Sequence, residues 1–277
     1  MIDDRLLPLE GLDNARDIGG LPLRDGGRTR HGVLLRTANP GPQFLTPRDV
    51  EFLVEDFGLR TVIDLRTPEE IEQHGRFVHD GVERLELTLI GSSRDALPEG
   101  VEITILDMYR GYLADHPQNV VTAVRTLAAP DAGPALVHCA AGKDRTGTVV
   151  ALVLDAVGVE RDAVVADYAL SALHIEAMFK RWTTAAGVPM PDPATLDRHR
   201  PRAENMEKLL GWLDETHDGA VGWLRAHGLT ADELERLRQR LTGRYSDDRE
   251  KGEDFKPGHS SPSCRAEKSR ERKTDAA

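Results

Sequence analysis

The 277-residue sequence has only two cysteines, Cys139 and Cys264, which lie 125 positions apart. So few cysteines cannot form a disulfide framework, and their scarcity indicates a reducing compartment. The first twenty residues contain no basic segment followed by an apolar core, so no signal peptide is visible. We therefore expect a cytoplasmic protein.

Positive charge is not in excess either. Lys and Arg number 36 against 47 Asp and Glu, which gives a formal net charge of −11. This balance argues against nucleic acid as a partner, because nucleic-acid binding needs a basic surface. A local basic pocket remains compatible with it, since binding follows the local field. No apolar run approaches 18 residues, so we expect no membrane span.

The last 32 residues, 246–277, differ in composition from the rest of the chain. They contain eight acidic and eight basic residues and no Leu, Ile or Val. Such a segment cannot bury enough apolar surface to offset the entropy of ordering it. We expect a disordered charged tail at 246–277, with Cys264 as an exposed thiol, and one folded domain over 1–245.

Residues 1–245 alternate between short apolar segments and helical patterns. Segments 58–66 and 134–139 predict buried strands. The alternation predicts an α/β fold with a short, mostly parallel central sheet covered by helices. The clearest helices are expected at 45–58 with Thr46 as N-cap, at 108–130 with a break at Pro117, at 145–158, and from Thr230 onward.

A loop rich in small residues separates the second strand from the apolar helix. Ala140, Ala141 and Gly142 let the backbone curl so that successive N–H groups point inward and form an anion nest. The helix that starts near Arg145 adds its unsatisfied N–H groups and the positive end of its dipole. A phosphate fits this cradle, and the Arg145 guanidinium can grip two of its oxygens at once.

The same field acts on Cys139, which precedes the small residues. A thiol beside a helix N-terminus and cationic groups favours the thiolate form and becomes a nucleophile toward phosphorus. Thr146 is placed to donate its hydroxyl to the sulfur. His138 is expected to orient the loop through its ring N–H, with a simple strand-end histidine as the alternative. A buried structural cysteine would not explain the Gly-Lys-Asp-Arg-Thr-Gly segment that follows.

The segment HCAAGKDRTG at 138–147 resembles the signature His-Cys-x-x-Gly-Lys-Asp-Arg-Thr-Gly of a bacterial family of cysteine-dependent tyrosine and lipid phosphatases. Segments 14–40, 45–70 and 167–171 are also similar to that family. The resemblance implies the cysteine-dependent tyrosine phosphatase fold, with 1–245 as catalytic domain. It also implies a cysteinyl-phosphate intermediate and phosphotyrosine, phosphoserine, phosphothreonine or phosphoinositides as substrates. No metal or other cofactor is expected.

Two aspartates compete as the acid that protonates the leaving group. Asp144 lies within the loop, next to the bound phosphate. Asp64 ends a predicted strand at the same sheet edge, and the resemblance assigns an acid there, so we favour it slightly. The alternative for Asp64 is a structural carboxylate paired with Arg66 or Arg16. Lys143 is expected either to hold a second anionic group of the substrate or to be a solvated surface lysine.

Two further features have structural interpretations. Arg16 and Asp17 are expected to pair and to hold the N-terminal hairpin under the loop. In 171–193, Met178, Phe179 and Trp182 are expected to pack on the core, with a lid over the pocket as the alternative.

Other functions remain in competition with the phosphatase. A rhodanese-like sulfurtransferase also uses a loop cysteine, but its chemistry does not require the Arg-Thr pair. A phospho-ligand-binding pseudophosphatase would usually lack Cys139 or Arg145. His74 and His79 have no nearby Cys or His partner that would indicate a zinc site.

Overall fold

A five-stranded sheet organises the part of the chain that the computed structural model describes, residues 5–7, 9–91 and 103–243. All described residues belong to one compact unit, Met1–Ser246; the predicted tail lies outside them. The strand order is β1-β2-β5-β3-β4, with β1 antiparallel to β2 and every other pair parallel, so the predicted sheet type is confirmed. The strands are β1 (Arg16–Asp17), β2 (Leu34–Thr37), β3 (Thr61–Asp64), β4 (Glu83–Glu86) and β5 (Ala135–His138).

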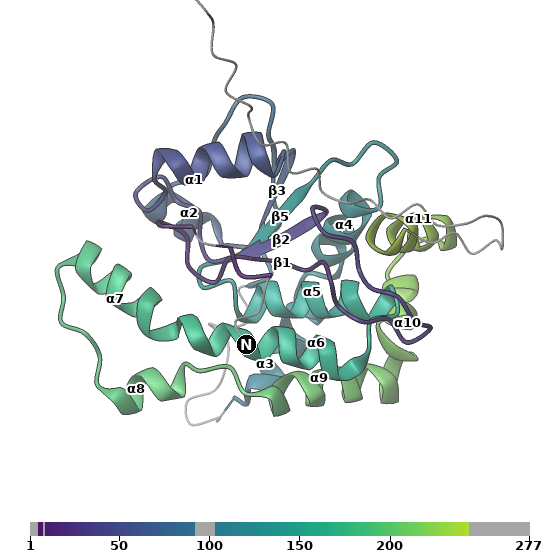
Figure 1. Cartoon of the computed structure of the whole chain (residues 1–277). Coiled ribbons are helices and arrows are strands. Elements are labelled where there is room, and N and C mark those ends of the chain that lie inside the picture. Colours follow the sequence, from purple (N-terminus) through teal and green to yellow (C-terminus); the bar gives the residue numbers. More distant parts are fainter. Residues whose placement is uncertain (1–4, 8, 92–102, 244–277) are drawn as a thin grey trace, which may run out of the picture. The chain divides into compact units, whose positions relative to one another are not determined.

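Alternating side chains of the central strands supply two separate apolar cores, because successive residues of a strand point to opposite faces. Leu35, Val62 and Leu136 pack with residues of the segment that contains α1 (Pro47–Glu51) and the π-helix η1 (Phe52–Asp56). Their neighbours Leu34, Ile63 and Val137 join the larger core on the other face. The sheet is thus covered on both sides (Figure 1).

Helices from α3 onward build the larger core. Helix α2 (Pro68–His74) lies near α1 (Figure 1). The larger core takes side chains from α3 (Ile105–Asp115), α4 (Pro117–Leu127), α5 (Asp144–Ala156), α6 (Arg161–Leu170), α9 (Ala203–His217), α10 (Gly219–Ala226) and α11 (Ala231–Thr242). A short 3-10 turn, η3 (Ser171–His174), leads into α7 (Ile175–Ala186) and α8 (Pro193–Arg198).

The helix ends follow local sequence signals. Thr46 and Thr230 are N-caps with complete capping boxes, as predicted. Thr67 and Thr104 make the same arrangement, and Pro117 separates α3 from α4, as expected. The helix predicted at 45–58 differs in one respect, since its second half is a π-helix.

Helix α5 fixes the end of the central strand in space. Every residue from Arg145 to Ala156 is buried, in agreement with its predicted all-round apolar character. In the register of β3 and β5, Asp64 lies opposite His138. The two predicted site segments therefore meet at the carboxyl edge of the sheet, where ligands bind in parallel α/β folds.

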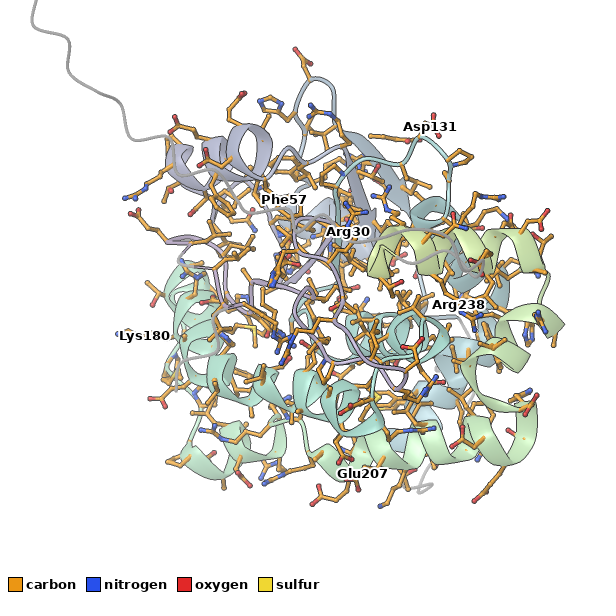
Figure 2. The ribbon with its side chains drawn as sticks, turned by 45° about the vertical axis from the view of Figure 1, so that its right-hand side comes forward. Arg30, Phe57, Asp131, Lys180, Glu207 and Arg238 are labelled. Carbon is orange, nitrogen blue, oxygen red and sulfur yellow. The ribbon has the colours of Figure 1, made fainter. Side chains whose placement is uncertain are left out.

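Lys180 of α7 and Glu207 of α9 are examples of charged side chains exposed on the outside of this unit (Figure 2). Among the described residues, no helix combines the length and the apolar character needed to cross a bilayer.

Candidate active site

The backbone carbonyl groups of the loop between β5 and α5 accept hydrogen bonds from residues outside the loop, and these bonds hold the loop in place. The backbone N–H of Asn39 donates to the carbonyl of Ala140 (2.9 Å). The side-chain amide of Asn14 donates to the carbonyls of Ala141 (2.9 Å) and Gly142 (3.0 Å). In a planar trans peptide, the N–H of the next residue points opposite to the carbonyl. Outward carbonyls therefore direct the following N–H groups to the inner side of the loop, as an anion nest requires.

The loop passes very close to the end of β2. Gly142 has φ +63°, and a Cβ built on it would lie 2.1 Å from the carbonyl oxygen of Thr37. Only glycine fits here, because any side chain would both strain the backbone and collide with the strand. Gly142 is thus required by the close approach of loop and strand.

A buried cluster of three arginines around one carboxylate lies behind the loop. Asp167 of α6 pairs with Arg5 (2.8 Å), Arg16 (3.0 Å) and Arg36 (2.6 Å), and all four side chains are buried. Burial alone would raise the pKa of Asp167, but the three guanidinium groups hold it well below its usual range. Arg36 also donates to the carbonyl of Gly142 (2.8 Å), so the cluster bears directly on the loop.

This cluster corrects one expectation from the sequence. Arg16 does not pair with Asp17 but with Asp167, and it also donates to the side-chain oxygen of Asn14 (2.5 Å). Asp17 instead accepts from the backbone N–H groups of Gly19 and Gly32 (both 2.8 Å). The physical reason is that α6 brings a buried carboxylate against the strand, and a buried guanidinium needs such a partner.

Cys139 is a free, buried thiol at the start of the loop. The Nδ1 atom of His138 lies 3.1 Å from the carbonyl oxygen of Cys139. A carbonyl only accepts, so this nitrogen carries the proton and donates to the loop, which agrees with the expected orienting contact. The Thr146 hydroxyl is buried and has no hydrogen-bond partner among the described residues, so the bond to sulfur expected from the sequence is not formed in the structure.

Arg145 makes a bidentate ion pair with Glu70 of α2. Its two terminal nitrogens lie 2.5 and 2.7 Å from the two carboxylate oxygens, and Nη1 also donates to the carbonyl of Leu65 (3.3 Å). Burial alone would lower the pKa of Arg145, but the hydrogen bonds to Glu70 and the nearby Cys139 raise it overall. The guanidinium is therefore a permanent cation held in one orientation beside the loop.

Asp64 has the surroundings of a structural carboxylate. Its side chain is fully buried, and Arg66 donates to both of its oxygens (2.9 and 2.7 Å). Burial opposes ionisation, but His138, whose Nε2 lies 3.6 Å away, and Arg66 together lower the pKa of Asp64. The pairing with Arg66 that was the structural alternative is confirmed, whereas Arg16 takes no part in it.

Asp144 is the more accessible of the two candidate acids, with 24% of its side chain exposed. The hydroxyl of Tyr109, from α3, donates to its Oδ1 atom (2.7 Å) and lies 2.6 Å from the hydroxyl of Tyr168. Burial raises the pKa of Tyr168 to about 12, so the Tyr168 hydroxyl stays protonated at neutral pH. The hydrogen bond from Tyr109 orients the Asp144 carboxylate.

Comparison with known proteins agrees with this geometry, since residues 7–243 match the profile of the tyrosine phosphatase family. The chain belongs to the tyrosine phosphatase family. It is 30% identical to a tyrosine-protein phosphatase of Nostoc commune over 220 residues, which cover 76% of this chain and 74% of that protein. It is also 34% identical to the triple specificity protein phosphatase PtpB of Mycobacterium tuberculosis over 169 residues, 55% of this chain and 60% of the other.

Solved structures are similar to a lesser degree. TpbA of Pseudomonas aeruginosa is 18% identical to this phosphatase, with a TM-score of 0.32, and the alignment covers 75% of this chain and 84% of that one.

Lys143 of the phosphatase is held by the segment after α8. Its Nζ atom donates to the carbonyl of His199 (2.6 Å) and lies 3.4 Å from a carboxylate oxygen of Asp144. Only 12% of the side chain is exposed. Lys143 is therefore not a solvated surface lysine.

Helices α7 and α8 form a small apolar cluster of their own next to the loop. Met178 is fully buried in it, and Phe179 and Trp182 pack against it together with Ala141 of the loop. The expected packing role is confirmed, but the partner is this small cluster beside the loop instead of the main core. Side chains of α7 and α8 thus belong to an apolar cluster that packs against Ala141 of the candidate catalytic loop.

Four residues with direct contacts to the site were not predicted: Glu70, Asn14, Arg36 and Tyr109. Glu70 carried a signal, because it is the capping-box residue of α2 directly after β3. Arg36 lies within a buried strand, where a charged residue needs a partner. Asn14 has φ +55°, a left-handed conformation that the sequence does not reveal. Tyr109 reads as an ordinary core aromatic of its helix.

Proposed function

We propose that the protein hydrolyses phosphomonoesters at this loop, with phosphotyrosine as its main substrate, and that residues 1–245 are the catalytic domain. The main support is the loop itself: its carbonyls are bonded outward by Asn14, Asn39 and Arg36, and Arg145 is fixed beside it. Such a nest of N–H groups with one fork-shaped cation suits a phosphate dianion.

In the first step, the thiolate of Cys139 attacks phosphorus. The S–P bond forms while the P–O bond to the leaving group breaks, and the phosphoryl group passes to the enzyme. The N–H groups of Ala140, Ala141, Gly142, Lys143 and Asp144, together with Arg145, hold the equatorial oxygens of the transferring group. They act by electrostatic stabilisation of the charge in the transition state.

We assign the general acid to Asp144 in preference to Asp64. Asp144 is partly exposed and oriented by Tyr109, so it can reach a leaving oxygen at the mouth of the loop. Asp64 is fully buried, and Arg66 takes both of its oxygens.

In the second step, water attacks phosphorus and the P–S bond breaks. Asp144, deprotonated by the first step, takes the proton of this water, and inorganic phosphate leaves. The buried Thr146 hydroxyl makes no hydrogen bond to the described residues before the reaction, so it is free to turn to the sulfur as the P–S bond breaks and to stabilise it as leaving group. His138 positions Cys139 through its carbonyl.

The substrate range follows from the relatives and from Lys143. The Nostoc relative is named a tyrosine-protein phosphatase and the mycobacterial one a triple specificity protein phosphatase. The Lys143 ammonium group donates to the carbonyl of His199 and lies near Asp144. It can bind a second anionic group of a substrate only after it breaks the hydrogen bond to the His199 carbonyl. Phosphotyrosine, which has no second anionic group on its ring, requires no such change.

The decisive experiment is a panel of substrates for wild type and Cys139→Ser. A phosphotyrosine peptide, a phosphoserine peptide and a phosphoinositide in mixed vesicles are compared by release of inorganic phosphate. We expect fastest turnover of the phosphotyrosine peptide. Cys139→Ser should lose activity on every substrate but still bind inorganic phosphate, because it lacks only the nucleophile.

Cys264→Ser provides the matched control, since it removes the other cysteine of the chain and should leave turnover unchanged. Alkylation by iodoacetate at pH 6 should reach Cys139 first, and phosphate should protect it. Activity in Cys139→Ser, or equal alkylation of both cysteines with no protection, would contradict the covalent mechanism.

A further inference from the structure

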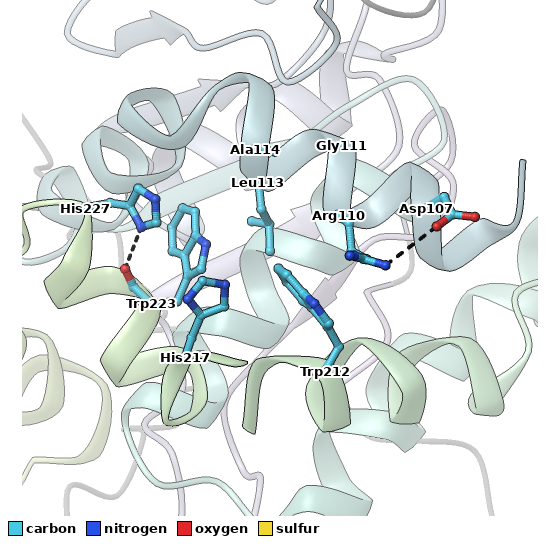
Figure 3. A pocket seen from close by; sticks show the side chains of 9 residues that line it. All are labelled: Asp107, Arg110, Gly111, Leu113, Ala114, Trp212, His217, Trp223 and His227. Carbon is cyan, nitrogen blue, oxygen red and sulfur yellow. Dashed lines mark hydrogen bonds and ion pairs between the residues drawn. The ribbon is translucent and has the colours of Figure 1, made fainter. Parts of the chain in front are cut away.

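A cleft of about 450 Å³ lies between α3, α9 and the end of α10, on a different face of α3 from the catalytic loop (Figure 3). Asp107, Arg110, Gly111 and Ala114 line it at the spacing i, i+3, i+4, i+7, which places them on one stripe of the helix. Tyr109, which bonds to Asp144, does not line it. The cleft is thus separate from the proposed catalytic site, and its volume is within the range of small-molecule sites.

One wall of the cleft is a chain of aromatic rings. Trp212 contacts His217 edge to face (5.0 Å between centroids), and His217 lies 6.5 Å from His227. His227 in turn stacks on Trp223 at 4.1 Å. The facing helix offers Gly111, where an added Cβ would meet nothing within 4 Å. Aromatic side chains on one side and open space on the other suit a flat aromatic ligand, because stacked and edge-to-face contacts between rings are favourable.

The polar groups of the cleft define the charge of the ligand. The guanidinium of Arg110 lies 5.2 Å over the ring of Trp212, and 48% of its side chain is exposed. Asp107, which also lines the cleft, forms an ion pair with this guanidinium at 3.8 Å, beyond hydrogen-bond distance. Burial and the neighbouring His227 lower the pKa of His217, so that ring is neutral at pH 7. The ion pair leaves the hydrogen-bond donors of Arg110 open to a closer acceptor, at one end of the aromatic wall.

We propose that this cleft binds a small planar aromatic carboxylate, with its ring against Trp212, His217 and His227 and its acid group on Arg110. A cationic ligand would meet Arg110 as a like charge. A neutral aromatic ring would gain the stacking but not the charge-assisted hydrogen bonds.

The test measures binding of three probes that share one ring system: 2-naphthoate, the neutral 2-naphthamide, and a 2-naphthylmethyl trimethylammonium salt. Isothermal titration calorimetry is run on the full chain with orthovanadate present, so that the catalytic loop is occupied and any aromatic acid binds elsewhere. We expect 2-naphthoate to bind about tenfold more tightly than the amide, the value of one charge-assisted contact. The ammonium salt should bind most weakly.

Variants then locate the site. Arg110→Gln should weaken 2-naphthoate about tenfold and leave the amide unchanged. Gly111→Leu fills the open space and should abolish binding of both, while helix propensity favours leucine over glycine and maintains the fold. Arg225→Gln removes an equal charge from an exposed position on α10 that does not line the cleft, and should have no effect.

Three results would overturn the proposal. They are no binding of 2-naphthoate when vanadate occupies the loop, equal or tighter binding of the ammonium salt, and unchanged 2-naphthoate affinity in Arg110→Gln. Phosphatase activity is not the readout, so failure here leaves the proposed function untouched.

Discussion

Arg145 and Glu70 show how one residue pair can fix a catalytic geometry. A free arginine side chain has many rotamers, and holding one of them costs conformational entropy. The two parallel hydrogen bonds from Glu70 hold the guanidinium in one plane before substrate arrives. Glu70 is itself fixed, because it also accepts from the backbone N–H of Thr67 at the start of α2.

Replacing Glu70 with Gln should therefore lower kcat about tenfold or more, the value of one to two hydrogen bonds to a charged group. Glutamine still completes a capping box, so α2 and the melting temperature should change little. The neighbouring exposed Glu69→Gln is the control. Steady-state kinetics on p-nitrophenyl phosphate, with phosphate inhibition as a measure of ground-state binding, should show an effect on kcat for Glu70→Gln alone. An equal loss in both variants would exclude the positioning role.

The choice between Asp144 and Asp64 rests on where each carboxyl group lies, and leaving-group dependence can test it. Asp144→Asn should reduce turnover of phenyl phosphate about 10²-fold more than turnover of p-nitrophenyl phosphate, whose leaving group needs little protonation. Asp64→Asn should lower stability and affect both substrates alike, because it leaves Arg66 buried without its partner. The reverse pattern would return the acid to Asp64.

Helix α6 stabilises the loop through Asp167, although it contributes no residue to the loop itself. The contact runs from Asp167 to Arg36 and from Arg36 to the carbonyl of Gly142. Each guanidinium in this cluster is buried, so its charge is tolerable only with the carboxylate in place. Loss of the Asp167 carboxylate would therefore leave three buried guanidinium groups, those of Arg5, Arg16 and Arg36, without this partner.

Asp167→Asn should lower the free energy of unfolding by about 3–5 kcal/mol, the cost of leaving buried charges unpaired. Asp214→Asn is the matched control, because Asp214 also pairs with an arginine (Arg161, 2.8 Å) but is half exposed. An exposed pair is worth about 1 kcal/mol or less. Urea denaturation measures both variants. Similar losses of unfolding free energy in the two variants would show that the buried cluster does not stabilise the fold more than an exposed ion pair does.

The strand–loop–helix element could be predicted because its signals are local. The apolar run of β5, the small loop residues and the largely apolar α5 lie within about twenty consecutive positions. The capping boxes at Thr46 and Thr230 also need only three residues of context. Even the meeting of Asp64 and His138 followed from one rule, that parallel strands end at the same edge.

The rest of the site depends on contacts between distant segments. Glu70 and Arg145 lie 75 positions apart, and Arg16 and Asp167 lie 151 apart. An arginine can satisfy its charge with any nearby carboxylate, so the neighbouring Asp17 was the natural but wrong partner for Arg16. The π-helix after Glu51 has no counterpart in the amphipathic pattern, which fits an α-helix equally well.

The whole domain should respond to acid in one direction, because its shifted carboxylates and histidines act together. Burial lowers the pKa of His138 from its ordinary 6.5, and also those of His174, His199 and His217. These side chains bind protons more readily when the chain is unfolded. Stability is therefore lost progressively as the pH falls below about 6.5.

The carboxylates extend this loss to lower pH. Asp64 and Asp167 have lowered pKa values in the folded protein, so their contribution is present above the ordinary value of 3.8 and declines as the pH falls toward the folded values. Both effects have the same sign, so the urea midpoint should fall steadily from pH 7 to 4 and more steeply below. In Asp167→Asn the steep part should become shallower, since that carboxylate no longer titrates. A midpoint that stays level or rises between pH 7 and 4 would mean that these buried groups do not govern the acid response.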